Sequence, residues 1–176
     1  MTILIKNGRL INPSENLDKV MDIFVEDGII KEKAESIEKQ ADTVIDAAGC
    51  YVMPGLIDLH VHFRDPGLTY KEDIETGSKA AAKGGFTTVC CMPNTKPVVD
   101  NVETVKYIIE KGEKTGLTNV LPVGAVTKNM AGVEITDVEE LKKAGICAIS
   151  EDGKSVMNSG VYRKAMKNAA KANVPV

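Results

Sequence analysis

The residues of this 176-residue chain that most clearly point to chemistry are its only two histidines, His60 and His62. They lie two positions apart within residues 54–67, which read PGLIDLHVHFRDPG. Residues i and i+2 of a β-strand face the same side of a sheet. On a strand over residues 55–62, both imidazoles would project together and form half of a divalent-metal site. Two core or loop histidines that make ordinary hydrogen bonds are the alternative.

A second group with metal-binding chemistry is the acidic pair Glu151 and Asp152, within the segment SEDG at residues 150–153. The pair follows a predicted strand, so that in a barrel one of its carboxylates could reach across the mouth to an ion held by the histidines. The two oxygens of a carboxylate can also bridge two ions. An ordinary Asp-Gly turn with an acidic neighbour is the alternative interpretation.

Arg64 and Asn94 are the residues that could bind an acidic substrate. Arg64 follows the histidine pair in a loop, where its planar guanidinium could hold a carboxylate bidentately. Asn94 follows the next predicted strand, and its amide could share that carboxylate. A solvated loop arginine and an asparagine in a turn after proline are the alternatives.

The elements that must position these residues alternate between strand and helix from residue 52 onward. The predicted strands cover residues 55–62, 86–92, 119–125 and 146–150, and the predicted helices cover 71–83, 101–114, 136–143 and 159–171. Residues 174–176 resemble the opening of a fifth strand. This alternation predicts parallel βα units, and four units are half of a (β/α)₈ barrel, which needs about 250 residues. An open doubly wound sheet is disfavoured because no glycine-rich phosphate motif follows a strand.

The side chains that alternate with the histidine pair should lie on the other face of the strand. Leu59, Val61 and Phe63 are therefore expected to face covering helices.

Residues 1–51 differ in character from the rest, with short β-branched runs at 2–5, 23–26 and 43–45. Turn dipeptides separate these runs: Asn7-Gly8, Asn12-Pro13 and Asp27-Gly28. The prediction is a small, incomplete β domain over 1–51 and a half-barrel over 52–176.

Composition argues against several classes of partner. The chain has 22 basic and 25 acidic residues and a net charge of −3, whereas binding to nucleic acid or to an anionic membrane needs clustered Lys and Arg. No apolar run approaches the roughly 20 residues of a membrane span, and the N-terminus does not read as a signal peptide. Cys50, Cys90, Cys91 and Cys147 show no CxxC spacing, which predicts small buried thiols in a reducing cytoplasm.

The chain resembles the class I bacterial dihydroorotases of the amidohydrolase superfamily, which are metal-dependent TIM barrels. Three segments carry this resemblance: residues 54–67, the segment GGFTTVCCMPNT at 84–95, and SEDG at 150–153. The resemblance implies an α/β fold, namely the N-terminal half of a (β/α)₈ barrel preceded by part of a small β-sandwich. It also implies that His60 and His62 bind one zinc ion and that Asp152 bridges two. Arg64 and Asn94 would hold the carboxylate of dihydroorotate.

The reaction implied by the resemblance is the reversible cyclisation of N-carbamoyl-L-aspartate to dihydroorotate in pyrimidine biosynthesis. A bound divalent cation suits it, because the cation lowers the pKa of water toward about 7 and stabilises a developing oxyanion. The expected partner is thus a small-molecule substrate, with no nucleic acid and no membrane. A homodimer or an association with aspartate transcarbamoylase is a further expectation.

The family pattern is incomplete within these 176 residues. The family uses two further histidines and a late aspartate as acid and base, and no His or Asp occurs after Asp152. The chain is therefore expected to be the N-terminal part of a longer enzyme and to be inactive by itself. Another cyclic amidohydrolase, of the allantoinase or dihydropyrimidinase type, and a non-catalytic dihydroorotase-like partner protein are the alternatives.

Overall fold

The computed structural model describes residues 1–176, and the chain divides into two compact units, Met1–Pro54 and Gly55–Val176. The boundary predicted from the sequence, between residues 51 and 52, falls within the short strand β5 (Tyr51–Val52), which pairs with the first strand of the chain. Each unit has its own sheet. Whether the units are independent domains stays a prediction.

The first unit is built on one five-stranded sheet. Its order is β3-β2-β1-β4, and β5 also pairs with β1. The strands are β1 (Thr2–Asn12), β2 (Leu17–Glu26), β3 (Ile29–Ala34), β4 (Thr43–Asp46) and β5, with a short 3₁₀ helix at Pro13–Glu15. The hairpin predicted at Asp27-Gly28 is confirmed, because it joins the antiparallel pair β2 and β3.

The turn predicted at Asn7-Gly8 is wrong, because this dipeptide lies inside β1. The pairing of β1 with β2 is irregular between Ile5 and Gly8, and Asn7 has a positive φ of 62°. The buried carboxylate of Asp22 accepts hydrogen bonds from the backbone N–H groups of Asn7 and Ile37, at 2.9 and 3.0 Å. The irregular backbone is therefore satisfied by a side chain, and the strand continues. Burial would raise the pKa of Asp22, but these two N–H groups and the nearby Lys6 ammonium together lower the pKa.

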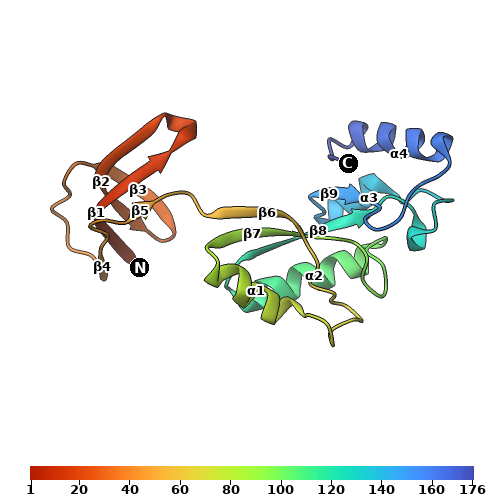
Figure 1. Cartoon of the computed structure of the whole chain (residues 1–176), viewed down its shortest axis with the longest axis horizontal. Helices are drawn as coiled ribbons and strands as arrows, with labels where there is room; N and C mark the ends of the chain where they lie inside the picture. Colours follow the sequence, from red (N-terminus) through yellow and green to blue (C-terminus); the bar gives the residue numbers. More distant parts are fainter. The chain divides into compact units, whose positions relative to one another are not determined.

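The second unit consists of four parallel βα units, as the sequence predicts (Figure 1). The strands run in the order β6-β7-β8-β9, and all neighbours are parallel. The elements are β6 (Leu56–Val61), α1 (Ile74–Lys83), β7 (Phe86–Cys91), α2 (Val102–Thr115), β8 (Asn119–Ala125), a 3₁₀ turn at Lys128–Met130, α3 (Val138–Ala144), β9 (Ala148–Ser150) and α4 (Ser159–Lys171). Helix α1 begins later than predicted because Asp73 caps it, its side chain accepting the Thr76 N–H.

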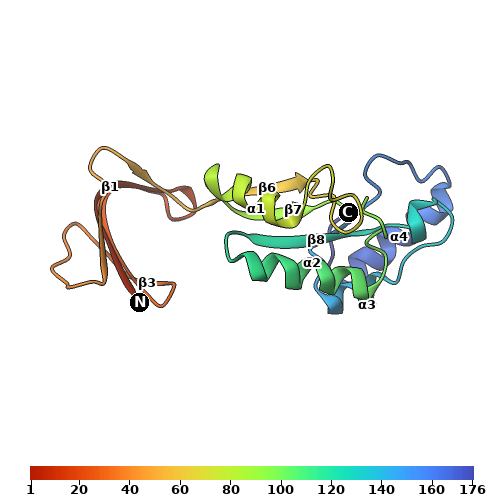
Figure 2. The same cartoon turned by 90° about the horizontal axis from the view of Figure 1, so that it is seen from below.

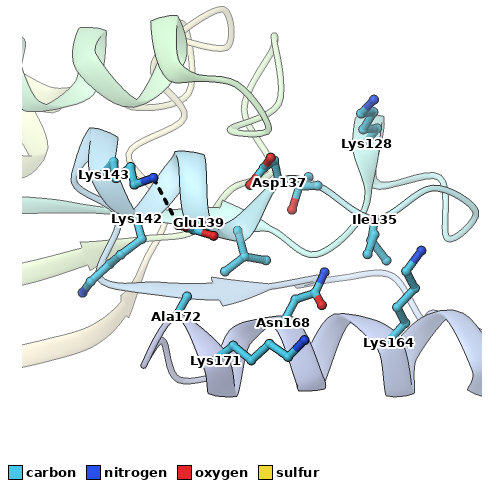
Figure 3. Close-up of a pocket in the computed structure, with 12 residues that line it drawn as sticks. Lys128, Ile135, Asp137, Glu139, Lys142, Lys143, Lys164, Asn168, Lys171 and Ala172 are labelled. Atoms are coloured by element: carbon cyan, nitrogen blue, oxygen red, sulfur yellow. Dashed lines mark hydrogen bonds and ion pairs between the residues drawn. The ribbon is translucent and has the colours of Figure 1, made fainter.

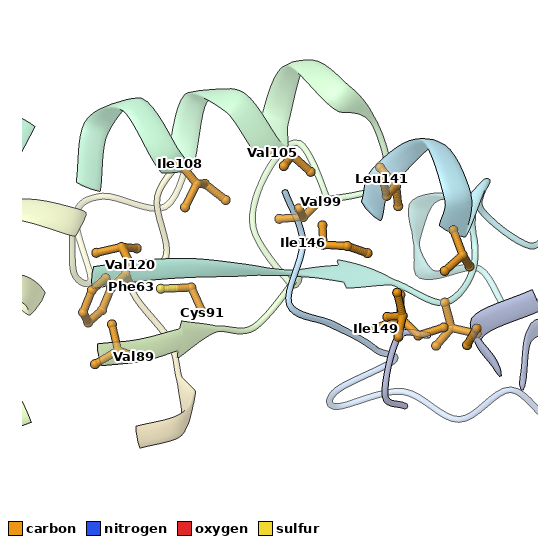
Figure 4. Close-up of a cluster of buried hydrophobic side chains, with 14 of the residues drawn as sticks. Phe63, Val89, Cys91, Val99, Val105, Ile108, Val120, Leu141, Ile146 and Ile149 are labelled. Carbon is orange, nitrogen blue, oxygen red and sulfur yellow. The ribbon is translucent and has the colours of Figure 1, made fainter. Parts of the chain in front are cut away.

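The four helices share one core with the outer face of this sheet (Figure 4). Helix α1 packs on β7 and α2 on β8, and α1 and α2 contact one another (Figures 1 and 2). The shared core contains Ile74 from α1, Val105 and Ile108 from α2, Leu141 from α3, Ala165 and Ala169 from α4, and Val89, Cys91, Val120 and Ile149 from the strands. The opposite face carries a smaller cluster around Cys90, Met92 and Val123. Both faces of the parallel sheet therefore bury apolar side chains.

The prediction that helices cover Leu59 is wrong, since 71% of this residue is exposed. Strand β6 is an edge strand of the sheet, and its pairing with β7 is irregular between Asp58 and Val61. This irregularity breaks the strict alternation of faces on which the prediction relied. Phe63 is buried as expected, and Val61 packs against the shared core.

The fifth strand predicted at residues 174–176 is also absent. One backbone hydrogen bond, from Ile149 N–H to the Pro175 carbonyl oxygen at 3.0 Å, joins this segment to β9. A single bond is not a ladder, and the proline at position 175 has no N–H with which to extend one. The segment is nonetheless anchored, because Val174 is buried.

The prediction that all four cysteines are buried holds only in part. All four thiols are free, and Cys90 and Cys91 are buried, but Cys147 is half-buried and Cys50 is exposed. Burial raises the pKa of Cys91, and it raises the pKa of Cys147 to about 12, with the neighbouring Cys90 adding to the shift. These two thiols are therefore weak nucleophiles at neutral pH.

None of the helices combines the length and the apolar character needed to cross a membrane.

Helix α1 offers a test of how closely it packs beneath the loop that follows β6. A Cβ added at Gly77 would lie 2.4 Å from two ring carbons of Phe63, so Gly77→Ala should destabilise the chain by about 1–3 kcal/mol through overpacking. Ser78→Ala is the matched control, because the buried Ser78 hydroxyl has no hydrogen-bond partner and its loss should be neutral or stabilising. Urea unfolding monitored by circular dichroism measures both variants. Equal stability of Gly77→Ala and the wild type would contradict this packing.

Candidate functional site

The structure brings His60, His62 and Asp152 together at the carboxyl ends of the parallel strands. His60 lies in β6, His62 directly follows it, and Asp152 follows β9. The Nε2 atom of His60 lies 3.2 Å from Asp152 Oδ1, and the Nε2 atom of His62 lies 3.4 Å from Asp152 Oδ2. The ring centroids are 5.1 Å apart, and one donor atom from each residue lies within 4.8 Å of the other two. Three side chains therefore converge, and one of them, Asp152, follows β9 at the opposite edge of the sheet from β6.

The acidic residues Glu151 and Asp152, of which the family resemblance implies Asp152 as the metal ligand, have different surroundings. Glu151 accepts hydrogen bonds from the backbone N–H groups of Val126 and Thr127, at 3.1 and 3.0 Å, and from the Thr127 hydroxyl. These contacts anchor the loop after β9 to the loop after β8. With Glu151 held in this way, Asp152 is the carboxylate that contacts the histidines.

Arg64 and Asn94 lie beside this cluster. One guanidinium nitrogen of Arg64 (Nη1) lies 3.3 Å from Asn94 Oδ1, and Asn94 also contacts His62 and Asp152 at 3.0 and 2.8 Å. The backbone of Arg64 is in the left-handed region, with φ of 58°. The predicted substrate-binding pair and the predicted metal-binding residues therefore form one connected network.

Asp65 is a residue near the site that the sequence reasoning missed. Its side chain is fully buried and accepts hydrogen bonds from the Tyr107 hydroxyl at 2.9 Å and from Lys111 Nζ at 2.6 Å, both on α2. It also accepts a bond from the N–H of Ile74, the first residue of α1. Asp65 thus ties the loop that carries Arg64 to two helices. Its place within the RDPG segment was the available signal, but Tyr107 and Lys111 lie about 40 residues or more away in the sequence.

The Asp65 carboxylate, which anchors this loop to α1 and α2, shifts the pKa values of its partners on α2. The hydrogen bond to Asp65 raises the pKa of Lys111 above its ordinary 10.5, and burial raises the pKa of Tyr107. Lys111 therefore stays charged opposite the buried carboxylate at physiological pH. The ion pair is partly protected from solvent, because the Lys111 side chain is 36% exposed and that of Asp65 is 0% exposed.

The converging side chains suit a divalent metal ion. Two imidazole nitrogens and a carboxylate are a donor set that zinc commonly takes and that other first-row ions also accept. The Nε2 atoms of both rings face the Asp152 carboxylate, so the donors point toward one another. His62 also has the outer hydrogen bond, to Asn94, that metal-bound histidines usually make.

A separate hollow lies away from these residues. A groove of about 790 Å³ runs along α3 and α4, and its lining includes Lys128, Lys142, Lys143, Lys164 and Lys171 (Figure 3). None of the predicted site residues lines it. Asp152 lines a smaller hollow of about 400 Å³ that is open to solvent.

Solved structures similar to this chain include two hydantoinases. The L-hydantoinase (dihydropyrimidinase) from Arthrobacter aurescens is 26% identical with a TM-score of 0.78, over 98% of this chain and 39% of that one. The D-hydantoinase (dihydropyrimidinase) from a Thermus species is 30% identical with a TM-score of 0.74, over 98% and 38%. The second unit is therefore the N-terminal part of a TIM-type barrel of the amidohydrolase class.

Sequence comparison assigns the chain to a narrower family within the amidohydrolase class. Residues 49–176 match the dihydro-orotase-like family model, so the chain belongs to the dihydroorotase-like family. A dihydroorotase of Pelobacter propionicus is 49% identical over 100% of this chain, and one of Aquifex aeolicus is 50% identical over 100%. The chain covers 42% of each of these relatives, and thus spans about two fifths of their length.

The Asp65 anchor generates a stability prediction. Lys111→Met should destabilise the chain by about 1–2 kcal/mol, because it leaves a buried carboxylate without its counter-charge, although the exposure of Lys111 lessens the cost. Lys79→Met is the matched control, because Lys79 pairs with Glu75 on the surface and should change stability by less than about 0.5 kcal/mol.

The pH dependence follows from the raised pKa of Lys111. The stabilisation by the pair should be fully present below pH 10.5 and be lost as the pH rises through the folded-state pKa. The difference in unfolding free energy between wild type and Lys111→Met should therefore be constant at neutral pH and shrink above pH 10.5. Urea titrations across this range measure it, and a difference that grows with alkaline pH would refute the assignment.

Proposed function

We propose that the protein to which this chain belongs is a dihydroorotase. It would catalyse the reversible cyclisation of N-carbamoyl-L-aspartate to dihydroorotate. The observation that carries the proposal is the convergence of His60, His62 and Asp152, to which Arg64 is linked by two hydrogen bonds through Asn94. Identity near 50% to dihydroorotases over the whole chain supports this substrate class. We also propose that the protein acts in the cytoplasm, as a homodimer or in association with aspartate transcarbamoylase.

The metal centre of this proposal uses the three converging side chains. His60 and His62 would hold one zinc ion, and Asp152 would bridge to a second. Bound zinc supplies Lewis-acid chemistry, which polarises an amide carbonyl and makes water more acidic. One donor atom from each of these residues lies within 4.8 Å of the other two, which supports their role as a ligand set.

Arg64 would orient the substrate without taking part in the bond changes. Its guanidinium can donate two parallel hydrogen bonds to the carboxylate of dihydroorotate, and Asn94 has one amide hydrogen left to donate. The reaction adds water across the ring C–N bond in one direction and expels it in the other. Arg64 would fix which ring carbonyl faces the histidines, and the anchored loop at Asp65 would keep the guanidinium in place.

A hydantoinase or dihydropyrimidinase activity is the second candidate. The likeness to two solved hydantoinases favours it, although their identities of 26% and 30% are well below those to the dihydroorotases. The discriminating residue is Arg64, because dihydroorotate carries a carboxylate that would pair with a guanidinium. A ring without a carboxylate would leave this charge without a partner.

The metal centre predicts stoichiometric zinc binding by the 176-residue chain. His60→Ala, His62→Ala and Asp152→Ala should each weaken zinc binding by more than about 100-fold, since each removes a direct ligand and loss of an outer partner alone costs about 10–100-fold. Glu139→Gln is the matched control, because Glu139 pairs with Lys143 on the exposed surface of α3 and should leave zinc affinity unchanged. Competition with a chromophoric chelator measures the affinities. Equal zinc affinity in the wild type and all three variants would refute this centre.

The substrate assignment is tested on the gene product. The reading frame downstream of the Val176 codon should be sequenced, and the longest product expressed with zinc and assayed on dihydroorotate and on hydantoin. Arg64→Met, assayed at saturating zinc, should reduce kcat/KM for dihydroorotate by at least about 100-fold, because it removes a charge-assisted bidentate contact of about 3 kcal/mol. Turnover of hydantoin but not dihydroorotate would favour the second candidate instead.

A further inference from the structure

Asn94 makes more contacts within the site than the binding of a substrate carboxylate requires. Its Oδ1 atom lies 3.0 Å from Nδ1 of His62 and 3.3 Å from Nη1 of Arg64. Its Nδ2 atom donates to Oδ2 of Asp152 at 2.8 Å. The three partners come from two different loops, so one amide links the first and last strands of the sheet.

The chemistry of these partners fixes the orientation of the amide. A guanidinium carries donors only, so the atom of Asn94 that faces Arg64 must be the oxygen. An ionised carboxylate carries acceptors only, so the atom that faces Asp152 must be the nitrogen. Both requirements select the same orientation, and neither of them involves His62.

The orientation of the amide in turn fixes the protonation of the His62 ring. Because His62 Nδ1 faces the Asn94 oxygen, which only accepts, Nδ1 must carry the proton. In the neutral ring the lone pair then lies on Nε2, which faces Asp152 and the other histidine. Only an unprotonated nitrogen can bind a metal ion.

We propose that Asn94 is a positioning residue for the metal centre: held by Arg64 and Asp152, its amide keeps His62 in the Nδ1–H tautomer and presents Nε2 to the metal. This inference rests on the proposed function for its metal, but it assigns Asn94 a role that is independent of substrate. It also links the two halves of the site, because the residue that would bind the substrate carboxylate orients the amide that orients a metal ligand.

The tautomer can be measured directly, since the chain contains only two histidines. The 176-residue chain with ring-¹⁵N-labelled histidine should give four ring-nitrogen signals in long-range ¹H–¹⁵N correlation spectra at pH 8. The expected result for the wild type, with and without zinc, is a protonated Nδ1 in His62. Asn94→Ala should give a mixture of His62 tautomers in the metal-free chain and weaken zinc binding about 10–100-fold. The ring signals of His60, which does not contact Asn94, provide an internal reference.

Two further variants separate positioning from general damage to the fold. Asn94→Asp keeps an oxygen that accepts from Nδ1–H but loses the N–H group that donates to Asp152. It should therefore restore the His62 tautomer that Asn94→Ala loses without restoring the link to Asp152. Asn119→Ala is the matched control at the opposite end of the sheet, where the Asn119 amide bonds only to Thr88, and it should leave both ring signals and zinc affinity unchanged. Circular dichroism verifies that each variant is folded.

The outcomes distinguish this inference from the proposed function. A wild-type His62 protonated on Nε2, or an Asn94→Ala variant with unchanged ring signals and unchanged zinc affinity, would overturn the inference. If the wild type bound no zinc, the metal centre of the proposed function would fail. The metal-free spectra would then still decide the role of Asn94, because the hydrogen bond to His62 does not depend on the ion.

Discussion

The hydrogen-bonded register of four parallel strands is the constraint on which the site depends. Because all four strands run in the same direction, their carboxyl ends lie at one edge of the sheet. Val61 pairs with Cys91 at the end of β6 and β7, and Ala125 pairs with Ser150 at the end of β8 and β9. The next few residues of each strand therefore meet, although His62, Asn94 and Asp152 are far apart in the sequence.

Two acidic side chains, the buried Asp65 and the half-buried Glu151, hold the loops at this edge. Asp65 joins the loop after β6 to α1 and α2, and Glu151 joins the loop after β9 to the loop after β8. Neither carboxylate points into the cluster of histidines. Both use their oxygens to bind backbone N–H groups and polar side chains, which restrains the neighbouring residues Arg64 and Asp152. A preorganised site needs such support, because the loops themselves have no ladder to hold them.

The sequence predicts the fold of the second unit well because hydrophobic periodicity is a local property. The four strands, the four helices and their alternation follow from residue types within short windows. The exposure and pairing of residues at the edges of the sheet do not follow from such short windows. Leu59 is exposed because β6 is an edge strand with irregular pairing, and residues 174–176 make one hydrogen bond to β9 in place of a ladder. Which neighbours a strand has depends on the whole sheet.

The same distinction between local sequence and tertiary structure applies to the functional site. The sequence alone identifies the histidine pair, the acidic segment at residues 150–153, and Arg64 and Asn94, because spacing and residue chemistry are visible in one dimension. Spacing alone does not choose between Glu151 and Asp152, although the family resemblance implies Asp152. Only the tertiary structure shows that Asp152 meets the histidines while Glu151 binds the loop after β8, and that the Asn94 amide contacts His62, Arg64 and Asp152 at once. The physical reason is that a hydrogen bond requires an atom-to-atom distance near 3 Å. Such a distance between segments far apart along the chain is set by packing and strand register.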